Sequence, residues 1–203
     1  MKTFVAAILG CTLVVVLAAA GGWIYLRHAA AGFSARAAPT RMEASLAEHA
    51  RAAAMPASIR ERRNPIASSP EALHEAMVHY ADHCAVCHAN NGSGDTMLGN
   101  GMYPRPPDMR TATTQNKTDG ELFSIIENGI RMSGMPAFGG NPATEGDSWK
   151  LVLFLRHLPQ LTPAELQAMN ALNPKSPDEI EEEKQEEEFL RGAEAPARVS
   201  RKK

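Results

Sequence analysis

The sequence is poor in aromatic residues and in cysteine, and its charges nearly cancel. Aromatic side chains make up 5% of the 203 residues, cysteine occurs three times, and the formal net charge is −2. A small domain with few aromatic side chains gains stability when something other than a side chain fills its centre, and a cofactor would do this. The near balance of charge provides no basic excess for a nucleic acid, and we expect no such partner.

The longest uncharged stretch lies at the N-terminus. Phe4 to Leu26 are 23 residues without a charge, more than the roughly 20 that a helix needs to cross a bilayer. Trp23 and Tyr25 lie at its end, as in the aromatic belts at membrane surfaces. The sequence therefore predicts a transmembrane anchor. A cleaved signal peptide with Ala18 to Gly22 as its cleavage region is the alternative, but the apolar stretch continues past that region.

Charge and proline divide the chain into four segments. Residues 1–27 are the anchor or cleaved signal, and residues 28–67 are a stalk, rich in alanine and arginine and interrupted by prolines, which we expect to be a solvated spacer. Residues 68–161 are the main domain. Residues 162–203 start with a short predicted helix, for which Thr162-Pro163-Ala164-Glu165 is the cap, and include Asp178 to Glu188, with eight acids and one lysine. Such a charged run predicts a solvated helix or a disordered tail, and steering of a basic partner is a further alternative.

The most specific motif is the run Cys84-Ala85-Val86-Cys87-His88. This spacing is the attachment signature of haem c: two thiols add across the haem vinyl groups, and the adjacent histidine is held under the iron. A four-ligand zinc site lacks partners, because the third cysteine, Cys11, lies in the anchor. A disulfide redox motif needs an alternation of strands and helices that the sequence does not show. We therefore expect one covalent haem c with its iron.

The iron of a covalent haem needs a ligand on its other face, and the sequence offers candidates after the attachment run. Met135 lies 47 residues after His88, in a loop that Gly134 and Pro136 shape. Its thioether is a candidate distal ligand. Met132 competes, although it closely follows a predicted helix and no proline stiffens the chain after it. The residues alone leave the choice between the two methionines open.

Several motifs together resemble one known family. Residues 64–161, about half of the chain, are similar to the class I c-type cytochromes, which are small helical proteins with one haem. Besides the attachment run, the resemblance rests on Asn91-Gly92-Ser93-Gly94-Asp95, Tyr103-Pro104-Arg105-Pro106-Pro107-Asp108, Asp119-Gly120-Glu121-Leu122 and Gly134-Met135-Pro136. The motifs are specific in combination rather than singly.

The resemblance implies a fold and a set of ligands. The fold would be all-α, a small cytochrome c fold wrapped around one covalent haem and preceded by the single N-terminal transmembrane helix. Met135 would be the distal ligand. In the family the proline-rich loop supplies a backbone carbonyl to the proximal histidine, so Pro104 or Pro106 would orient His88. Arg105 would then be the partner of a haem propionate.

Helix start signals agree with this plan. Ser69-Pro70-Glu71 predicts a helix that leads into Cys84. Thr118-Asp119-Gly120-Glu121 is a capping box for a middle helix, and a last helix is expected from about Asp147 to Leu158. Ala76 occupies the position at which the family usually has a glycine, where the first and last helices cross.

The implied function is electron transfer. With His88 and Met135 both on the iron, no position stays open for a small ligand. We therefore expect an electron carrier rather than an enzyme, with transient redox protein partners and no small-molecule substrate. A haem c subunit of a larger respiratory or dehydrogenase complex is one alternative, and a haem peroxidase or gas sensor is another.

The family also implies a location. Its haem is attached outside the bacterial cytoplasm, which would make this a single-pass protein of the bacterial inner membrane with the haem domain on the periplasmic side. The charge bias favours the opposite orientation, because Lys2 stands alone before the span while Arg27, Arg36 and Arg41 follow it. We give the attachment chemistry more weight and expect the periplasmic side.

Overall fold

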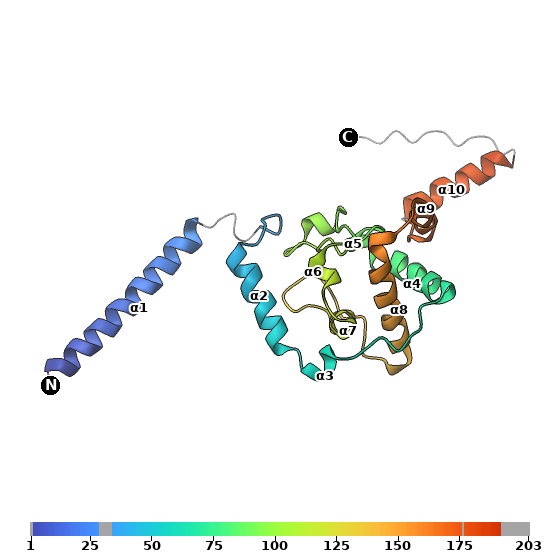
Figure 1. Cartoon of the computed structure of the whole chain (residues 1–203). Helices are drawn as coiled ribbons and strands as arrows, with labels where there is room; N and C mark the ends of the chain where they lie inside the picture. The colour runs from blue at the N-terminus through green and yellow to red at the C-terminus, as the bar shows by residue number, and fades with distance from the viewer. Residues whose placement is uncertain (1, 29–33, 176, 192–203) are drawn as a thin grey trace.

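The computed structural model describes residues 2–28, 34–175 and 177–191 (Figure 1). All the regular secondary structure within these residues is helical. The α-helices are α1 (Lys2–His28), α2 (Arg41–Ala54), α3 (Ala57–Arg60), α4 (Pro70–His83), α5 (Ala85–His88), α6 (Ala112–Gln115), α7 (Asp119–Asn128), α8 (Glu145–His157), α9 (Pro163–Leu172) and α10 (Pro177–Leu190). Short 3-10 turns lie at Gly99–Gly101, Pro142–Thr144 and Leu158–Gln160. The all-α prediction is confirmed.

Helix α1 contains the predicted span and projects away from the packed part of the chain (Figure 1). Its section Thr3–Arg27 is 25 residues long, has a mean hydropathy of 2.5 and is not buried. A single-pass membrane anchor is compatible with these properties. An N-terminal signal sequence meets the same criteria. The preference for an anchor therefore rests on the apolar stretch that continues past the possible cleavage region.

Three helices start at the caps that the sequence predicts. The Ser69 hydroxyl accepts a hydrogen bond from the Ala72 N–H (3.1 Å) at the start of α4. Thr118 and Thr162 each form a complete capping box, at α7 and α9. Each box supplies acceptors for N–H groups that no helical carbonyl can reach. The predicted last helix of the main domain, α8, begins at Glu145, two residues before the expected Asp147.

The core lies where α4 crosses α8. Ala76 is 1% exposed, and Val152 and Phe154 of α8 are fully buried. The rings of Tyr80 and Phe154 lie 4.8 Å apart between centroids, in the range of favourable aromatic pairs. An alanine in place of the usual glycine therefore still permits this crossing.

Part of the predicted stalk packs on the domain. The Thr118 hydroxyl donates to the Arg60 carbonyl (2.7 Å), and the Asn64 amide donates to the Trp149 carbonyl (2.8 Å). The Arg62 guanidinium stacks over the Phe123 and Trp149 rings, at 4.6 and 5.1 Å from their centroids. The packed unit thus begins upstream of the expected boundary at residue 68, and Arg62 contributes to it by packing on aromatic faces.

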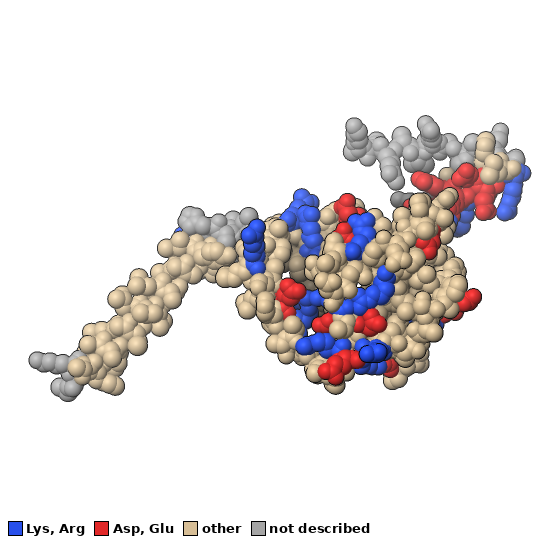
Figure 2. Space-filling model, viewed as in Figure 1, with Lys and Arg blue, Asp and Glu red and all other residues tan. Residues whose placement is uncertain are grey.

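The packed unit also continues past residue 161. Met169 of α9 is fully buried in the core, and His157 bonds to the Glu165 carboxylate (2.8 Å). Helix α10 is different: most of its described side chains are exposed, and acidic residues gather over it (Figure 2). The acidic run therefore forms a solvated helix as far as Leu190, and the rest of the predicted tail, from residue 192, lies outside the described residues.

Candidate haem site

The predicted attachment residues follow α4 without a break. Cys84 is the C-cap of α4, and its N–H donates to the Tyr80 carbonyl (2.8 Å). The Cys84 carbonyl in turn accepts from the N–H groups of Cys87 (3.2 Å) and His88 (2.9 Å). One helical turn, α5, therefore holds both thiols and the imidazole, as the spacing predicts.

The carbonyls at the end of this turn are all satisfied. Cys87 accepts from the Thr96 hydroxyl (3.3 Å), His88 from the Gly94 N–H (2.9 Å) and Ala89 from the Tyr80 hydroxyl (2.9 Å). A buried backbone carbonyl without a partner would be costly. The loop after His88 is thus folded back against the attachment turn and fixed to α4.

Burial sets the protonation of this site. It raises the pKa of the Cys84 thiol to about 12, with a smaller contribution from the neighbouring Cys87. Burial also lowers the pKa of His88. A neutral thiol is a poor nucleophile for disulfide exchange, whereas a neutral imidazole is the form that binds a metal. These shifts argue against a dithiol redox motif, and they leave His88 in the form that binds a metal.

His88 also has an unused polar atom. Its Nδ1 is the one buried side-chain nitrogen or oxygen, among the described residues, that has no hydrogen-bond partner. A buried polar atom without a partner costs free energy, and an imidazole that binds iron uses one nitrogen as ligand and the other as donor. Together with the two thiols, this donor set fits a covalently attached haem.

The expected acceptor lies near but is not bonded to His88. Pro106 packs against the loop after the attachment turn: a Cβ on Gly94 would come within 2.5 Å of the Pro106 carbonyl oxygen. Gly94 has φ of +73°, so both its conformation and its lack of a side chain are needed there. Pro104 and Pro106 thus lie on the same loop beside the attachment turn, and their role toward His88 stays a prediction.

Met135 lies in a loop that folds back on α7. Its carbonyl accepts from the Ile130 N–H (3.2 Å), and the Phe138 N–H donates to the Ile126 carbonyl (3.0 Å). Met135 is partly buried, whereas Met132 is 92% exposed. The backbone therefore fixes Met135 beside the end of α7 and directs Met132 into solvent, which favours the first of the two candidates.

A comparison with protein-family models agrees with this geometry. Residues 71–155 match the model described as cytochrome c oxidase, cbb3-type, subunit III. The chain contains a c-type cytochrome domain. The match runs from the first turn of α4 to α8 and includes both the attachment turn and Met135. No curated protein matches the chain.

Arg105 lies on the surface of the cytochrome domain. Its guanidinium donates to the Asn100 side chain (3.3 Å), and Asn100 donates to Asp95 (2.7 Å). The side chain is exposed. The structure therefore shows Arg105 as part of a surface hydrogen-bonded chain, and its role toward a propionate remains a prediction.

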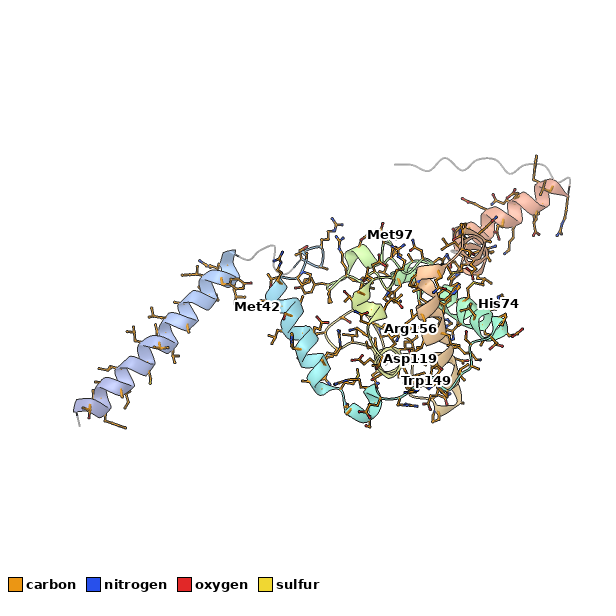
Figure 3. The ribbon with its side chains drawn as sticks, in the orientation of Figure 1. Met42, His74, Met97, Asp119, Trp149 and Arg156 are labelled. Carbon is orange, nitrogen blue, oxygen red and sulfur yellow. The ribbon has the colours of Figure 1, made fainter. Side chains whose placement is uncertain are left out.

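Sequence reasoning missed one residue that organises the cytochrome domain. Arg156, near the end of α8, donates to Asp119 at the start of α7 (3.0 and 2.8 Å) and to the Gln115 carbonyl of α6 (2.7 Å) (Figure 3). It also donates to the Lys117 carbonyl. The one signal in the sequence was a charge placed directly after the apolar run 151–155. Arg156 thereby holds α6 and the start of α7 on α8.

Proposed function

We propose that this protein carries single electrons between redox partners of the bacterial cell envelope. The thiols of Cys84 and Cys87 would attach one haem c, and His88 and Met135 would hold its iron from the two sides. The bound haem supplies a one-electron couple between ferrous and ferric iron. The observation that carries the proposal is the partly buried turn in which two neutral thiols adjoin an imidazole with an unpartnered buried nitrogen, within a cytochrome c domain.

The two side chains that would hold the iron determine what chemistry the site could do. A methionine opposite a histidine leaves no position for peroxide or a small gas, and it raises the reduction potential relative to two histidines. The folded-back loop holds Met135 in place through backbone hydrogen bonds to α7. This favours a carrier over a peroxidase or a gas sensor. Pro104 or Pro106 would supply the carbonyl that orients His88.

A second candidate is a haem c subunit of a larger oxidoreductase complex. The matching model describes a subunit of a cbb3-type cytochrome c oxidase, and this is the observation that favours it. Electron transfer through the cytochrome domain is common to both candidates. Purification of the full chain from its native membranes in mild detergent separates them, because a subunit travels with its complex while a free carrier elutes alone.

We further propose that α1 anchors the protein in the inner membrane with the cytochrome domain on the periplasmic side. The length and apolarity of α1 support the anchor. Haem attachment outside the cytoplasm, which the resemblance implies, supports the orientation against the charge bias of the flanking residues. Protease protection in intact spheroplasts tests it: an outward domain is digested from outside.

The carrier function is tested on the full chain produced together with a haem c maturation system. We expect a reversible one-electron redox wave, a weak far-red sulfur-to-iron band in the ferric state, and no binding of carbon monoxide to the ferrous state. Rapid carbon monoxide binding by the wild-type protein would show an open iron position and would contradict the proposal.

A further inference from the structure

Helix α2 of the predicted stalk is tied to the cytochrome domain at its C-terminal end. The Arg60 guanidinium donates to the carbonyls of Ala52 (2.9 Å) and Met55 (3.2 Å), which end α2. The Arg60 carbonyl accepts from Thr118, the N-cap of α7. A Cβ on Gly120 would also collide with the Ile59 carbonyl. The last turn of α2 is therefore fixed beside the start of α7.

The N-terminal end of α2 lies near the proline-rich loop. Thr40 and Glu43 form its capping box, with the Thr40 N–H donating to the Glu43 carboxylate (2.7 Å). Tyr103, the residue before Pro104, lies beside this carboxylate: desolvation of the phenol, and then the Glu43 charge, raise its pKa. Helix α2 thus extends from the loop that precedes Pro104 to the helix that leads into the Met135 loop (Figure 1).

Between α2 and the domain lies a cavity of about 470 Å³. Arg51 and Met55 line it from α2, and Lys117 and Ile125 from the opposite wall. Ile125 lies one turn before Gly129, where a Cβ would come within 2.7 Å of the Met135 carbonyl. The cavity is therefore adjacent to the segment that carries the proposed distal ligand.

Some of the charged side chains that line this cavity have a partner, and others do not. Glu121 is engaged, since it accepts from the Thr118 N–H (2.7 Å) and lies 3.8 Å from Arg60. Arg51 and Lys117 are both partly buried, and neither side chain has an ion pair or hydrogen bond to any described residue. Glu48 is the remaining acid of the wall. Two unpaired cations thus face a space that Met55 and Ile125 also line.

We propose that this cavity receives the propionate-bearing edge of the haem, and that Arg51 and Lys117 pair with its carboxylates. The inference rests on the proposed function and adds α2 to the haem-binding residues. A haem edge combines an apolar ring with two carboxylates, and the wall offers Met55 and Ile125 for the ring and two cations for the acids. A partly buried carboxylate needs a paired cation, and both cations of this wall are themselves partly buried.

The experiment compares cation variants of the full, matured chain by redox titration at several pH values. Arg51→Gln and Lys117→Gln should each lower the midpoint potential, because an uncompensated carboxylate stabilises ferric iron. The potential should also become dependent on pH between about pH 5 and about pH 8, since loss of a cation raises the pKa of the propionate. Lowering the pH then protonates the carboxylate and raises the potential again.

Three controls accompany these variants. Arg51→Lys keeps the charge and should restore the wild-type titration. Glu48→Gln removes an anion from the same wall and should shift the potential upward. Arg63→Gln removes an exposed cation that does not line the cavity and should leave the titration close to wild type. Should Arg51→Gln fail to mature, Lys117→Gln and Glu48→Gln still decide the question.

Two results would overturn the inference. One is a wild-type titration for both Arg51→Gln and Lys117→Gln, and the other is a shift of the same size in Arg63→Gln. The pyridine haemochrome spectrum of each sample reports haem attachment separately. A wild-type chain without haem would contradict the proposed function and this inference together, whereas attached haem with unchanged titrations contradicts this inference alone.

Discussion

The attachment turn and the distal loop hold their proposed ligands in different ways. The turn of Cys84 to His88 is fixed on both sides, by helix α4 before it and by a loop whose N–H and hydroxyl groups satisfy its carbonyls. The loop of Met135 is held mainly by backbone hydrogen bonds to the end of α7, and its neighbour Met132 lies in solvent. The comparison indicates a rigid proximal side, needed for covalent attachment, and a distal side that can lose its ligand while the fold persists.

The largest effect is expected from removing the distal thioether. Met135→Ala should abolish the far-red sulfur-to-iron band and open the iron to carbon monoxide, because no other side chain of the loop is held in its place. The haem should stay attached, since both thiols and His88 are on the other side. Absorption spectra of the ferric and ferrous protein measure this.

Met132→Ala is the matched control for that variant. The side chain is 92% exposed, so its removal should leave the band and the resistance to carbon monoxide unchanged. Loss of the band in Met132→Ala but not in Met135→Ala would reverse the assignment of the distal ligand.

The next largest effect is expected on the proximal side, at Gly94. Gly94→Ala places a side chain at φ of +73° and against the Pro106 carbonyl. Backbone strain of this kind costs about 1–3 kcal/mol, and the contact adds to it, so the free energy of unfolding should fall by at least that amount. Gly101→Ala is the control, because nothing lies within 4 Å of its Cβ. Equal unfolding midpoints in denaturant for the two variants would contradict the close packing of the proline-rich loop.

A smaller effect is expected from the hydrogen bond that joins α4 to the attachment turn. Tyr80→Phe removes the hydroxyl that donates to the Ala89 carbonyl (2.9 Å) and leaves that carbonyl without a partner. The free energy of unfolding should fall by about 1–2 kcal/mol. Burial holds the pKa of Tyr80 well above its usual value, so the loss should not depend on pH in the neutral range. A stability equal to that of the wild type would show that the turn does not need this bond.

The smallest effect is expected in the distal loop. The Ser133 hydroxyl donates to the Ile130 carbonyl (2.8 Å) and accepts from the Met135 N–H (3.2 Å). Ser133→Ala should lower the free energy of unfolding by about 1 kcal/mol or less, since the loop is partly exposed and water can replace the hydroxyl. It should also raise the rate at which an added ligand such as imidazole displaces Met135. A displacement rate no faster than wild type would show that the loop is as rigid as the proximal turn.

Local patterns predicted much of this molecule. The caps at Ser69, Thr118 and Thr162 predicted three helix starts, because a cap is a contact between residues three apart. The spacing of Cys84, Cys87 and His88 predicted one helical turn for the same reason. Each of these features depends only on neighbours in the sequence.

Contacts between distant residues could not be predicted in this way. Arg62 is one of several basic residues in the stalk, and nothing near it in the sequence indicates that it stacks on Phe123 and Trp149. Met169 lies in a segment that resembles a peripheral helix, yet it is fully buried. Arg156 acts on Asp119, 37 residues before it. The sequence placed these residues on elements, but only the packed structure shows what each element meets.

The central claim is that two thioethers and one imidazole fix a single haem. Mass spectrometry of the full chain, produced with a haem c maturation system and treated with a thiol-alkylating reagent after denaturation, tests it most directly. The account predicts a mass increased by one haem, with Cys84 and Cys87 unreactive and Cys11 alkylated. A chain without added haem mass, in which all three cysteines react, would contradict it.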